Sequence, residues 1–366
     1  MPPGRAARDG CRVSGSLPAG SVMADAPLAE GGGDALVVVD QLVRHFGARG
    51  RRADQAVRAV DDVSFEIRRG ETFGLVGESG SGKSTLARLL LRLDRPTSGR
   101  VLFDGDDVFS MSAREHRRLR PRMQMVFQDP FASLNRRKTA EQTIAFPLRV
   151  HQPHLRPAAR AARVHELLDL VGLRSSHAGA YPRQLSGGQC QRVSIARALA
   201  LGAEFVVLDE AVSAVDVSIQ AQILNLLREL QERLGLTYLF VSHDLAVVRY
   251  MSNSIGVMYH GRIVELGSRE QLFSSPQHPC THALLASIPS PEPPEELERQ
   301  HAIVHEEVAS DARVEGCRFH PRCPLGSREL CQTIEPTLDP VSPGHRAACH
   351  YPQSAESLAE QAATTP

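Results

Sequence analysis

A glycine-rich loop at residues 77–84 constrains the fold of this chain more than any other feature. It follows a short apolar run, residues 72–76, and precedes a stretch with apolar residues at helical spacing. A short apolar strand that leads through such a loop into a helix is typical of a parallel sheet whose strands are buried on both faces. The apolar side of the helix is expected to consist of Leu86, Leu89, Leu90 and Leu93.

The loop itself has the composition of a phosphate-binding site. Its glycines let the backbone curl so that successive N–H groups point at phosphate oxygens, and the helix that follows adds the positive end of its dipole. Lys83 is expected to reach the β- and γ-phosphates, and the Ser84 hydroxyl to coordinate Mg²⁺. A bare glycine-rich turn is the alternative, which the flanking strand and helix disfavour. The residues predicted to bind the nucleotide are Gly77, Glu78, Ser79, Gly80, Ser81, Gly82, Lys83, Ser84 and Thr85.

A second apolar run, residues 205–208, supplies the acidic groups that hydrolysis of a nucleotide needs. It ends at Asp209 and Glu210, where the ligands of a parallel sheet collect. Asp209 is expected to hold the Mg²⁺ shell, and Glu210 to orient or deprotonate the attacking water. A lone strand that ends in two acids is common and by itself structural. Downstream of a phosphate loop, the catalytic interpretation is favoured.

Charge and composition exclude several classes of protein. The chain has 366 residues with 42 basic and 42 acidic side chains, so its formal net charge is zero. Zero net charge gives no global attraction to nucleic acid or to an anionic membrane. The 42% hydrophobic content is typical of a globular protein rather than a fibre or coiled coil. No window approaches the 18 apolar residues of a membrane span.

The order of the segments predicts a mostly parallel α/β core with additions at both ends. Residues 1–34 are expected to be a disordered leader, with Met23 as an alternative start, and residues 351–366 a disordered tail. Strands are predicted near residues 36–39, 60–67, 124–127, 238–241 and 255–258, in addition to the two described above. The Arg-rich residues 44–55 are expected to form a loop, and residues 110–122 a basic helix.

A run before the helical stretch at residues 190–200 identifies the family that the sequence resembles. Its Ser and two Gly are suited to open a helix whose free N–H groups grip an anion. The run is Leu185, Ser186, Gly187, Gly188 and Gln189. Together with the phosphate loop, it resembles the signature of the ATP-binding subunits of ABC (ATP-binding cassette) transporters. The resemblance implies that residues 186–189 of one subunit bind the ATP held by another.

The resemblance implies a fold and further site residues. The fold is a P-loop nucleotide-binding domain over residues 35–275, with a RecA-like core, an antiparallel β subdomain and a helical subdomain at about 129–195. A small Cys-containing segment follows at 276–350. By the same resemblance, Gln128 senses the γ-phosphate and Mg²⁺, Asp216 belongs to a loop crossing the dimer interface, and His243 contacts the γ-phosphate. Phe46 is the candidate for stacking on adenine.

Three further strings are similar to the ATPases of dipeptide and oligopeptide importers. They are residues 128–135, 216–222 and 278–285. The similarity implies an ATPase that powers peptide uptake from the cytoplasmic face of the cell membrane. Its partners would be two permease subunits, a second ATPase subunit in a heterodimer or homodimer, and indirectly an extracytoplasmic peptide-binding protein, without nucleic acid. Alternatives are nickel or small glycosides as substrate, or a soluble ABC ATPase acting on nucleic acid or ribosomes.

Four cysteines near the C-terminus leave several interpretations open. They are Cys317, Cys323, Cys331 and Cys349. Disulfides are rare in cytosolic proteins, and the usual zinc spacing is absent. Four thiolates suit a [4Fe–4S] cluster, and four reduced cysteines in a small core are the plain alternative. Because the surrounding string is similar to peptide-importer ATPases, some of which hold an iron–sulfur cluster, the resemblance favours [4Fe–4S], with zinc second.

Overall fold

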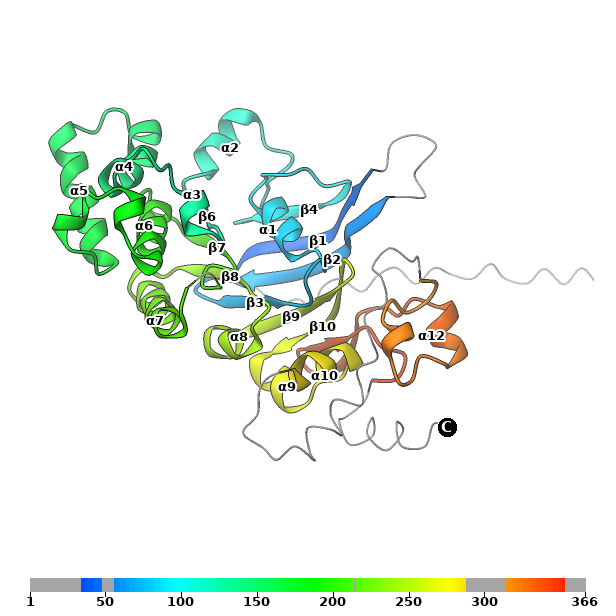
Figure 1. The fold of residues 1–366 in the computed structure, drawn as a ribbon. Helices are drawn as coiled ribbons and strands as arrows, with labels where there is room; N and C mark the ends of the chain where they lie inside the picture. Colours follow the sequence, from blue (N-terminus) through cyan, green and yellow to red (C-terminus); the bar gives the residue numbers. More distant parts are fainter. Residues whose placement is uncertain (1–33, 48–55, 214, 288–313, 353–366) are drawn as a thin grey trace, which may run out of the picture. The chain divides into compact units, whose positions relative to one another are not determined.

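Two β-sheets organise the computed structural model of this chain (Figure 1), which describes residues 34–47, 56–213, 215–287 and 314–352. The predicted leader, apart from Asp34, and the predicted tail beyond Pro352 lie outside the described residues. All described residues belong to one compact unit that begins at Asp34.

The larger sheet carries the predicted parallel core. Its strand order is β11-β12-β10-β9-β3-β8-β7-β6, and the five strands from β9 to β6 are parallel. The predictions of strands at 72–76, 205–208 and 238–241 are confirmed to within a residue. The strands are β3 (Thr72–Val76), β6 (Met123–Val126), β7 (Phe205–Asp209), β8 (Thr237–Val241), β9 (Ser254–Tyr259), β10 (Arg262–Ser268), β11 (Asp339–Ser342) and β12 (His345–Ala347).

The smaller sheet is antiparallel, with the order β2-β1-β4-β5. Its strands are β1 (Ala35–Phe46), β2 (Val57–Arg68), β4 (Ser98–Phe103) and β5 (Asp106–Asp107). The expectation of a loop from residue 44 is wrong for 44–46, because β1 continues to Phe46 by pairing with β2 across several irregular registers. The two sheets share a core in which the rings of Phe65 and Phe73 stack at 4.6 Å.

Some helices cover the larger sheet, and others form a separate group beside it. Figure 1 shows α4, α5 and α6 lying together, in agreement with their mutual contacts. Helix α1 ends at Leu90, so the predicted apolar side is wrong at Leu93, which is exposed. The helices are α1 (Lys83–Leu90), α2 (Ala113–Leu119), α3 (Pro130–Ser133), α4 (Ala140–His151), α5 (Pro157–Leu170), α6 (Gly187–Leu199), α7 (Val217–Leu234), α8 (Leu245–Met251), α9 (Arg269–Ser274), α10 (Pro279–Ala286) and α12 (Glu329–Thr333), with short 3₁₀ turns η2 (Ser175–His177), η3 (Pro182–Gln184) and η4 (His320–Arg322).

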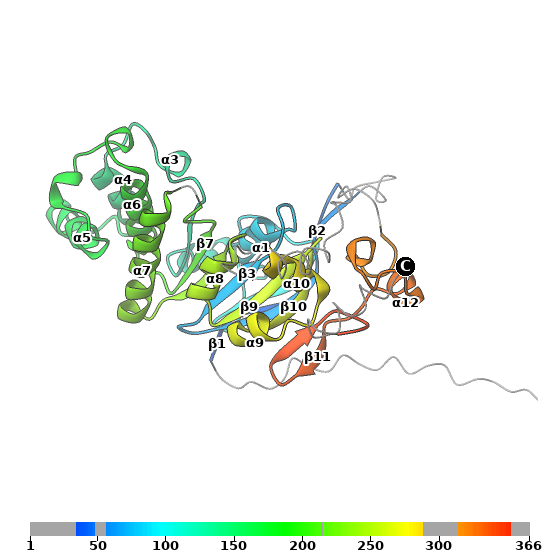
Figure 2. The same ribbon diagram turned by 60° about the horizontal axis from the view of Figure 1, so that its bottom comes forward.

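The C-terminal segment, defined here as residues 314–352, continues the larger sheet. Strand β12 pairs with β10, and β11 pairs with β12 at the edge (Figure 2). The fully buried Glu265 of β10 joins the two parts, because its carboxylate accepts hydrogen bonds from the backbone N–H groups of Gln277 and His278 and contacts His345 at 2.7 Å. The segment is therefore built into the sheet. No helix in the described part of the chain is long and apolar enough to cross a membrane.

Candidate nucleotide-binding and hydrolysis site

The phosphate loop joins β3 to α1 and requires glycine at two positions. Gly77 has φ +148°, and a Cβ atom there would lie 2.0 Å from the carbonyl oxygen of Met258. Gly82 has φ +108°, and its Cβ would lie 1.9 Å from the carbonyl oxygen of Ala59. Real Cβ atoms do not approach backbone so closely, and L side chains rarely adopt these φ values. The neighbouring strands therefore hold the loop in its curled form.

Lys83 places its ammonium group inside this loop. Its Nζ donates to the carbonyl oxygens of Gly77 and Glu78, both at 2.7 Å, and to Oγ of Ser81 at 3.3 Å. Burial lowers the pKa of Lys83, while the carboxylates of Glu210, Asp209 and Glu78 oppose that shift. A buried ammonium group among backbone N–H groups is suited to a polyanionic phosphate chain.

Ser84 and Asp209 meet at the end of the parallel strands. The Ser84 hydroxyl donates to Oδ1 of Asp209 at 3.0 Å, and Asp209 is the last residue of β7. Burial raises the pKa of Asp209, although the hydrogen bond from Ser84 lowers it. A hydroxyl and a carboxylate at this distance are the hard oxygen ligands that Mg²⁺ takes when phosphates and water complete its shell. The residues present therefore fit the predicted ion.

Glu210 lies at the centre of a second polar group. Nε2 of Gln128 donates to its Oε2 at 2.5 Å, and Nδ1 of His243 lies 3.2 Å from its Oε1. Glu210 has φ +48°, which is uncommon for a residue with a side chain and is often found at functional sites. The structure thus brings together the three residues predicted to carry catalysis. Their individual roles remain predictions.

The predicted signature residues lie at the start of α6, where the side chains of Ser186 and Gln189 each accept a hydrogen bond from the backbone N–H of the other residue. The backbone N–H of Gln189 donates to Oγ of Ser186 at 3.2 Å, and that of Ser186 donates to Oε1 of Gln189 at 3.0 Å. This capping box fixes the helix N-terminus. A Cβ atom at Gly188 would lie 2.4 Å from Cγ2 of Ile219, so glycine lets α6 and α7 approach. Gly187 begins the helix.

Two remaining predicted residues lie at the ends of elements. Asp216 is the residue before α7, and its side chain accepts no capping hydrogen bond from the helix. Ala214, in the same loop, lies outside the described residues. Phe46 ends β1, is 38% exposed, and carries the guanidinium group of Arg44 4.3 Å from its ring centre. An exposed ring at this edge is compatible with stacking on a base, and the assignment stays a prediction.

The predicted iron–sulfur or zinc centre is wrong. In the described residues no group of three or more His, Cys, Asp or Glu side chains is arranged to hold a metal ion. The four cysteines line a cavity of only about 10 Å³, which has room for about one water molecule. Burial also raises the pKa of Cys323 and Cys349 to about 12, so these thiols stay protonated at neutral pH. Cys317 and Cys323 pack against the hydrophobic core. All four of these cysteines are free in the structure.

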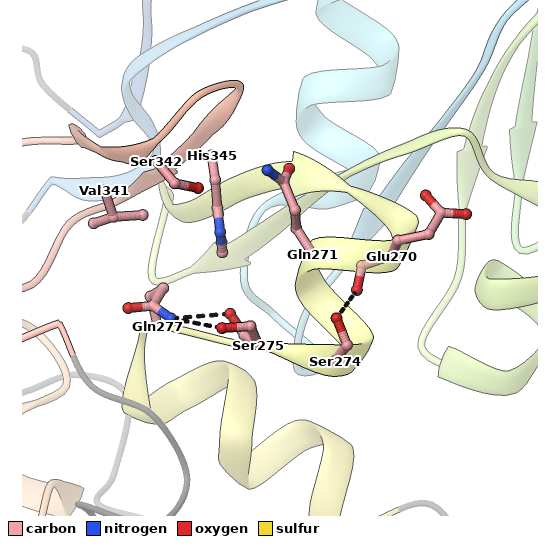
Figure 3. A pocket seen from close by; sticks show the side chains of 8 residues that line it. All are labelled: Glu270, Gln271, Ser274, Ser275, Gln277, Val341, Ser342 and His345. Atoms are coloured by element: carbon pink, nitrogen blue, oxygen red, sulfur yellow. Dashed lines mark hydrogen bonds between the residues drawn. The ribbon is translucent and has the colours of Figure 1, made fainter.

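A cavity of about 240 Å³ lies away from the phosphate loop (Figure 3). It lies between α9 and the β11–β12 hairpin. The Ser274 hydroxyl donates to the carbonyl oxygen of Glu270, and Nε2 of Gln277 donates to the carbonyl oxygen and the hydroxyl of Ser275. Its lining residues are Glu270, Gln271, Ser274, Ser275, Gln277, Val341, Ser342 and His345.

Two arginines of the C-terminal segment contact the cassette, and sequence reasoning missed both. Arg318 contacts Asp61 and also donates to Glu335. Arg322 donates to both carboxylate oxygens of Glu78, in the phosphate loop. Neither contact has a local sequence signal, because the partners are 257 and 244 residues apart.

The geometry defines a class of protein, a P-loop ATPase of the cassette type. A protein-family model for ABC transporters matches residues 60–213, and one for the C-terminal region of oligopeptide and dipeptide transporters matches residues 264–331. The oligopeptide transport ATP-binding protein AppF of Bacillus subtilis is 48% identical over 80% of this chain and 89% of its own length. YkfD of the same organism is 46% identical over 88% and 97%.

Solved structures show the same fold. The ATP-binding cassette MJ0796, bound to ADP and phosphate, has a TM-score of 0.58 and 30% identity over 64% of this chain and 98% of its own. CbiO1 from Clostridium perfringens has a TM-score of 0.59 and 28% identity over 66% and 92%. The chain belongs to the family of ATP-binding proteins of ABC transporters, in its oligopeptide and dipeptide branch. It is an ATPase.

Proposed function

We propose that this chain couples ATP hydrolysis to the import of dipeptides or oligopeptides. The observation that carries the proposal is the C-terminal match to oligopeptide and dipeptide transporters over residues 264–331. That region includes most of β10, α10 and the first part of the C-terminal segment. Glu265 of β10 accepts a hydrogen bond from the backbone N–H of His278, the residue before α10. The relative AppF is itself named as an oligopeptide transport protein.

In the proposed mechanism, the phosphate loop and Lys83 would hold the triphosphate, and Ser84, Asp209 and Gln128 would hold Mg²⁺. The ion would neutralise phosphate charge when it is bound. Glu210 accepts a proton from the attacking water or orients it, since its carboxylate is the acceptor shared by Gln128 and His243. His243 is 59% exposed in its side chain, so it is free to reach the γ-phosphate.

The proposed partners follow from the family. Two permease subunits would span the membrane, and residues 129–147 of the helical subdomain would meet them at the cytoplasmic face. Phe131 and Phe146 in this stretch are exposed, and exposed aromatic side chains favour protein contacts. A second ATPase subunit would supply residues 186–189 across the ATP, and Phe46 would stack on adenine. We also propose the division into a cassette at 35–275 and a C-terminal part at 276–350.

The test is reconstitution of the chain with its permease subunits in lipid vesicles. Peptide-loaded binding protein is expected to stimulate ATP hydrolysis. The control is the Glu210→Gln variant in the same vesicles, which should bind ATP without stimulated hydrolysis. Stimulation by DNA or ribosomes, together with no association with the permease subunits, would refute the proposal.

A further inference from the structure

The phosphate loop, which is expected to bind a polyanion, contains an acidic side chain whose negative charge would oppose that binding. Glu78 is the second residue of the phosphate loop, and its backbone carbonyl oxygen accepts from Lys83 at 2.7 Å. A carboxylate so near a triphosphate repels it, because like charges in a partly desolvated site interact strongly. The carboxylate is only one-third exposed in this structure, so water alone does not screen it.

Arg322 of the C-terminal segment cancels this charge. Its Nη1 lies 2.7 Å from Oε1 and 2.8 Å from Oε2 of Glu78. The Arg322 side chain is only 8% exposed, so the pair is shielded from solvent. Burial lowers the pKa of Arg322, but the hydrogen bonds with Glu78 and Tyr259 outweigh it and raise the pKa above its ordinary value. A charge-assisted contact of this kind is stronger than one between neutral groups.

The surroundings fix the guanidinium group in place. The ring of Phe319 lies with its centre 5.5 Å from the guanidinium carbon. Phe319 in turn meets Tyr259 edge-on at 5.3 Å, and Tyr259 is the last residue of β9. The preceding residue, Met258, provides the carbonyl oxygen that crowds Gly77. Arg322 is therefore held against the same strand end that shapes the phosphate loop.

We propose that Arg322 is a positioning residue for ATP binding. Its guanidinium group neutralises the charge of Glu78 and holds the Glu78 carboxylate away from the triphosphate. The C-terminal segment thereby completes the electrostatics of the nucleotide site from outside the cassette. The proposal rests on ATP binding by the phosphate loop and is independent of the transported substrate. If the chain does not support peptide import, the proposed role of Arg322 is unaffected. If Arg322 does not have this role, the proposal of peptide import is unaffected.

The test measures KM and kcat for Mg-ATP with the full chain and three variants. Arg322→Met is expected to raise KM about tenfold, with kcat within about twofold, because repulsion by Glu78 weakens nucleotide binding. The effect of Arg322→Met is then measured in the Glu78→Gln background. There it is expected to change KM by less than about threefold relative to Glu78→Gln alone, since no carboxylate then remains to repel the nucleotide.

A matched control separates this effect from loosening of the C-terminal segment. Arg318→Met removes the contacts of a second, partly buried arginine of that segment, which bonds to Asp61, Glu335 and the carbonyl oxygen of His260 and to no residue of the phosphate loop. It is expected to lower stability and leave KM unchanged. An unchanged KM in Arg322→Met, the same rise in KM when Arg322→Met is added to Glu78→Gln, or an equal rise in Arg318→Met would each overturn the proposal.

One further variant tests the proposal even if the methionine variant does not fold. Arg322→Lys keeps the positive charge, and its KM is expected to stay within about threefold of the unmodified chain. A tenfold rise would contradict charge neutralisation. If Arg322→Met folds, the ratio of its KM to that of the unmodified chain is expected to fall by about half in 0.5 M salt, because salt screens the repulsion between Glu78 and the triphosphate. A defect independent of salt would contradict the proposal.

Discussion

Asp61 is expected to make the free energy of unfolding of the protein depend on pH in the acidic range. This residue of β2 is 7% exposed, lies 2.9 Å from Nε2 of His45 and contacts Arg318 of the C-terminal segment. Burial raises the pKa of Asp61, but the hydrogen bonds from Arg318 and His45 and the charges of Arg318 and Arg262 outweigh it and lower the pKa from 3.8 to about 2. At 1.36 kcal/mol per pKa unit, this difference contributes about 2 kcal/mol to the free energy of unfolding at neutral pH.

The sign follows from the direction of the shift. Because the folded pKa lies below the unfolded one, the contribution is present above pH 4 and is lost as pH falls toward 2. Asp61→Asn is therefore expected to lower the free energy of unfolding by about 2 kcal/mol at pH 7. The difference between the two proteins should fall to about 1 kcal/mol at pH 3.

Urea unfolding followed by circular dichroism at pH 7, 4 and 3 measures this difference. The control is Asp62→Asn, since the neighbouring Asp62 side chain is 53% exposed and lies 4.0 Å from Arg262. Exposed pairs contribute about 0–1 kcal/mol. A loss below about 0.5 kcal/mol for Asp61→Asn at pH 7, or a difference that does not shrink with acid, would refute the reasoning.

Three other substitutions test the catalytic site and the sheet. Glu210→Gln is expected to lower kcat about a thousandfold and leave ATP affinity within about threefold, as measured by hydrolysis and nucleotide binding; an unchanged rate would remove Glu210 from the mechanism. Gly82→Ala is expected to weaken ATP binding about tenfold or more because its Cβ would lie 1.9 Å from the Ala59 carbonyl oxygen, whereas normal binding would show that the loop adapts. Glu265→Ala is expected to cost about 3–5 kcal/mol in urea unfolding, since buried donors including His345 lose their acceptor; a loss no larger than in the exposed-site control Glu270→Ala would contradict this.

Local sequence patterns predicted the elements that carry the nucleotide chemistry. These elements are β3, the phosphate loop, and β7 with Asp209 and Glu210. The apolar composition of the two strands predicts that they are buried, and the glycines of the loop predict a turn. The meeting of Glu210 with Gln128 and His243 follows from parallel strands that end at one edge of the sheet. Strand β3, the phosphate loop and β7 were predictable because each consists of contiguous residues, whereas Gln128 and His243 were assigned by resemblance to the family.

Other parts depend on contacts between distant residues. The continuation of β1 to Phe46 and the addition of β12 to β10 come from pairing partners that no local pattern specifies. The contact of Arg322 with Glu78 spans 244 residues. The spacing of the cysteines could not reveal that their side chains enclose only about 10 Å³, and the metal prediction was wrong for that reason.

The most direct test of peptide import is ATP hydrolysis in vesicles that contain the chain and its permease subunits. A mixture of di- to pentapeptides on the binding protein is expected to raise the rate of hydrolysis and to drive peptide uptake. Nickel ions and small glycosides are expected to do neither. Stimulation by nickel or glycoside with no response to peptides would contradict the account, while peptide uptake that disappears in Glu210→Gln vesicles would support it.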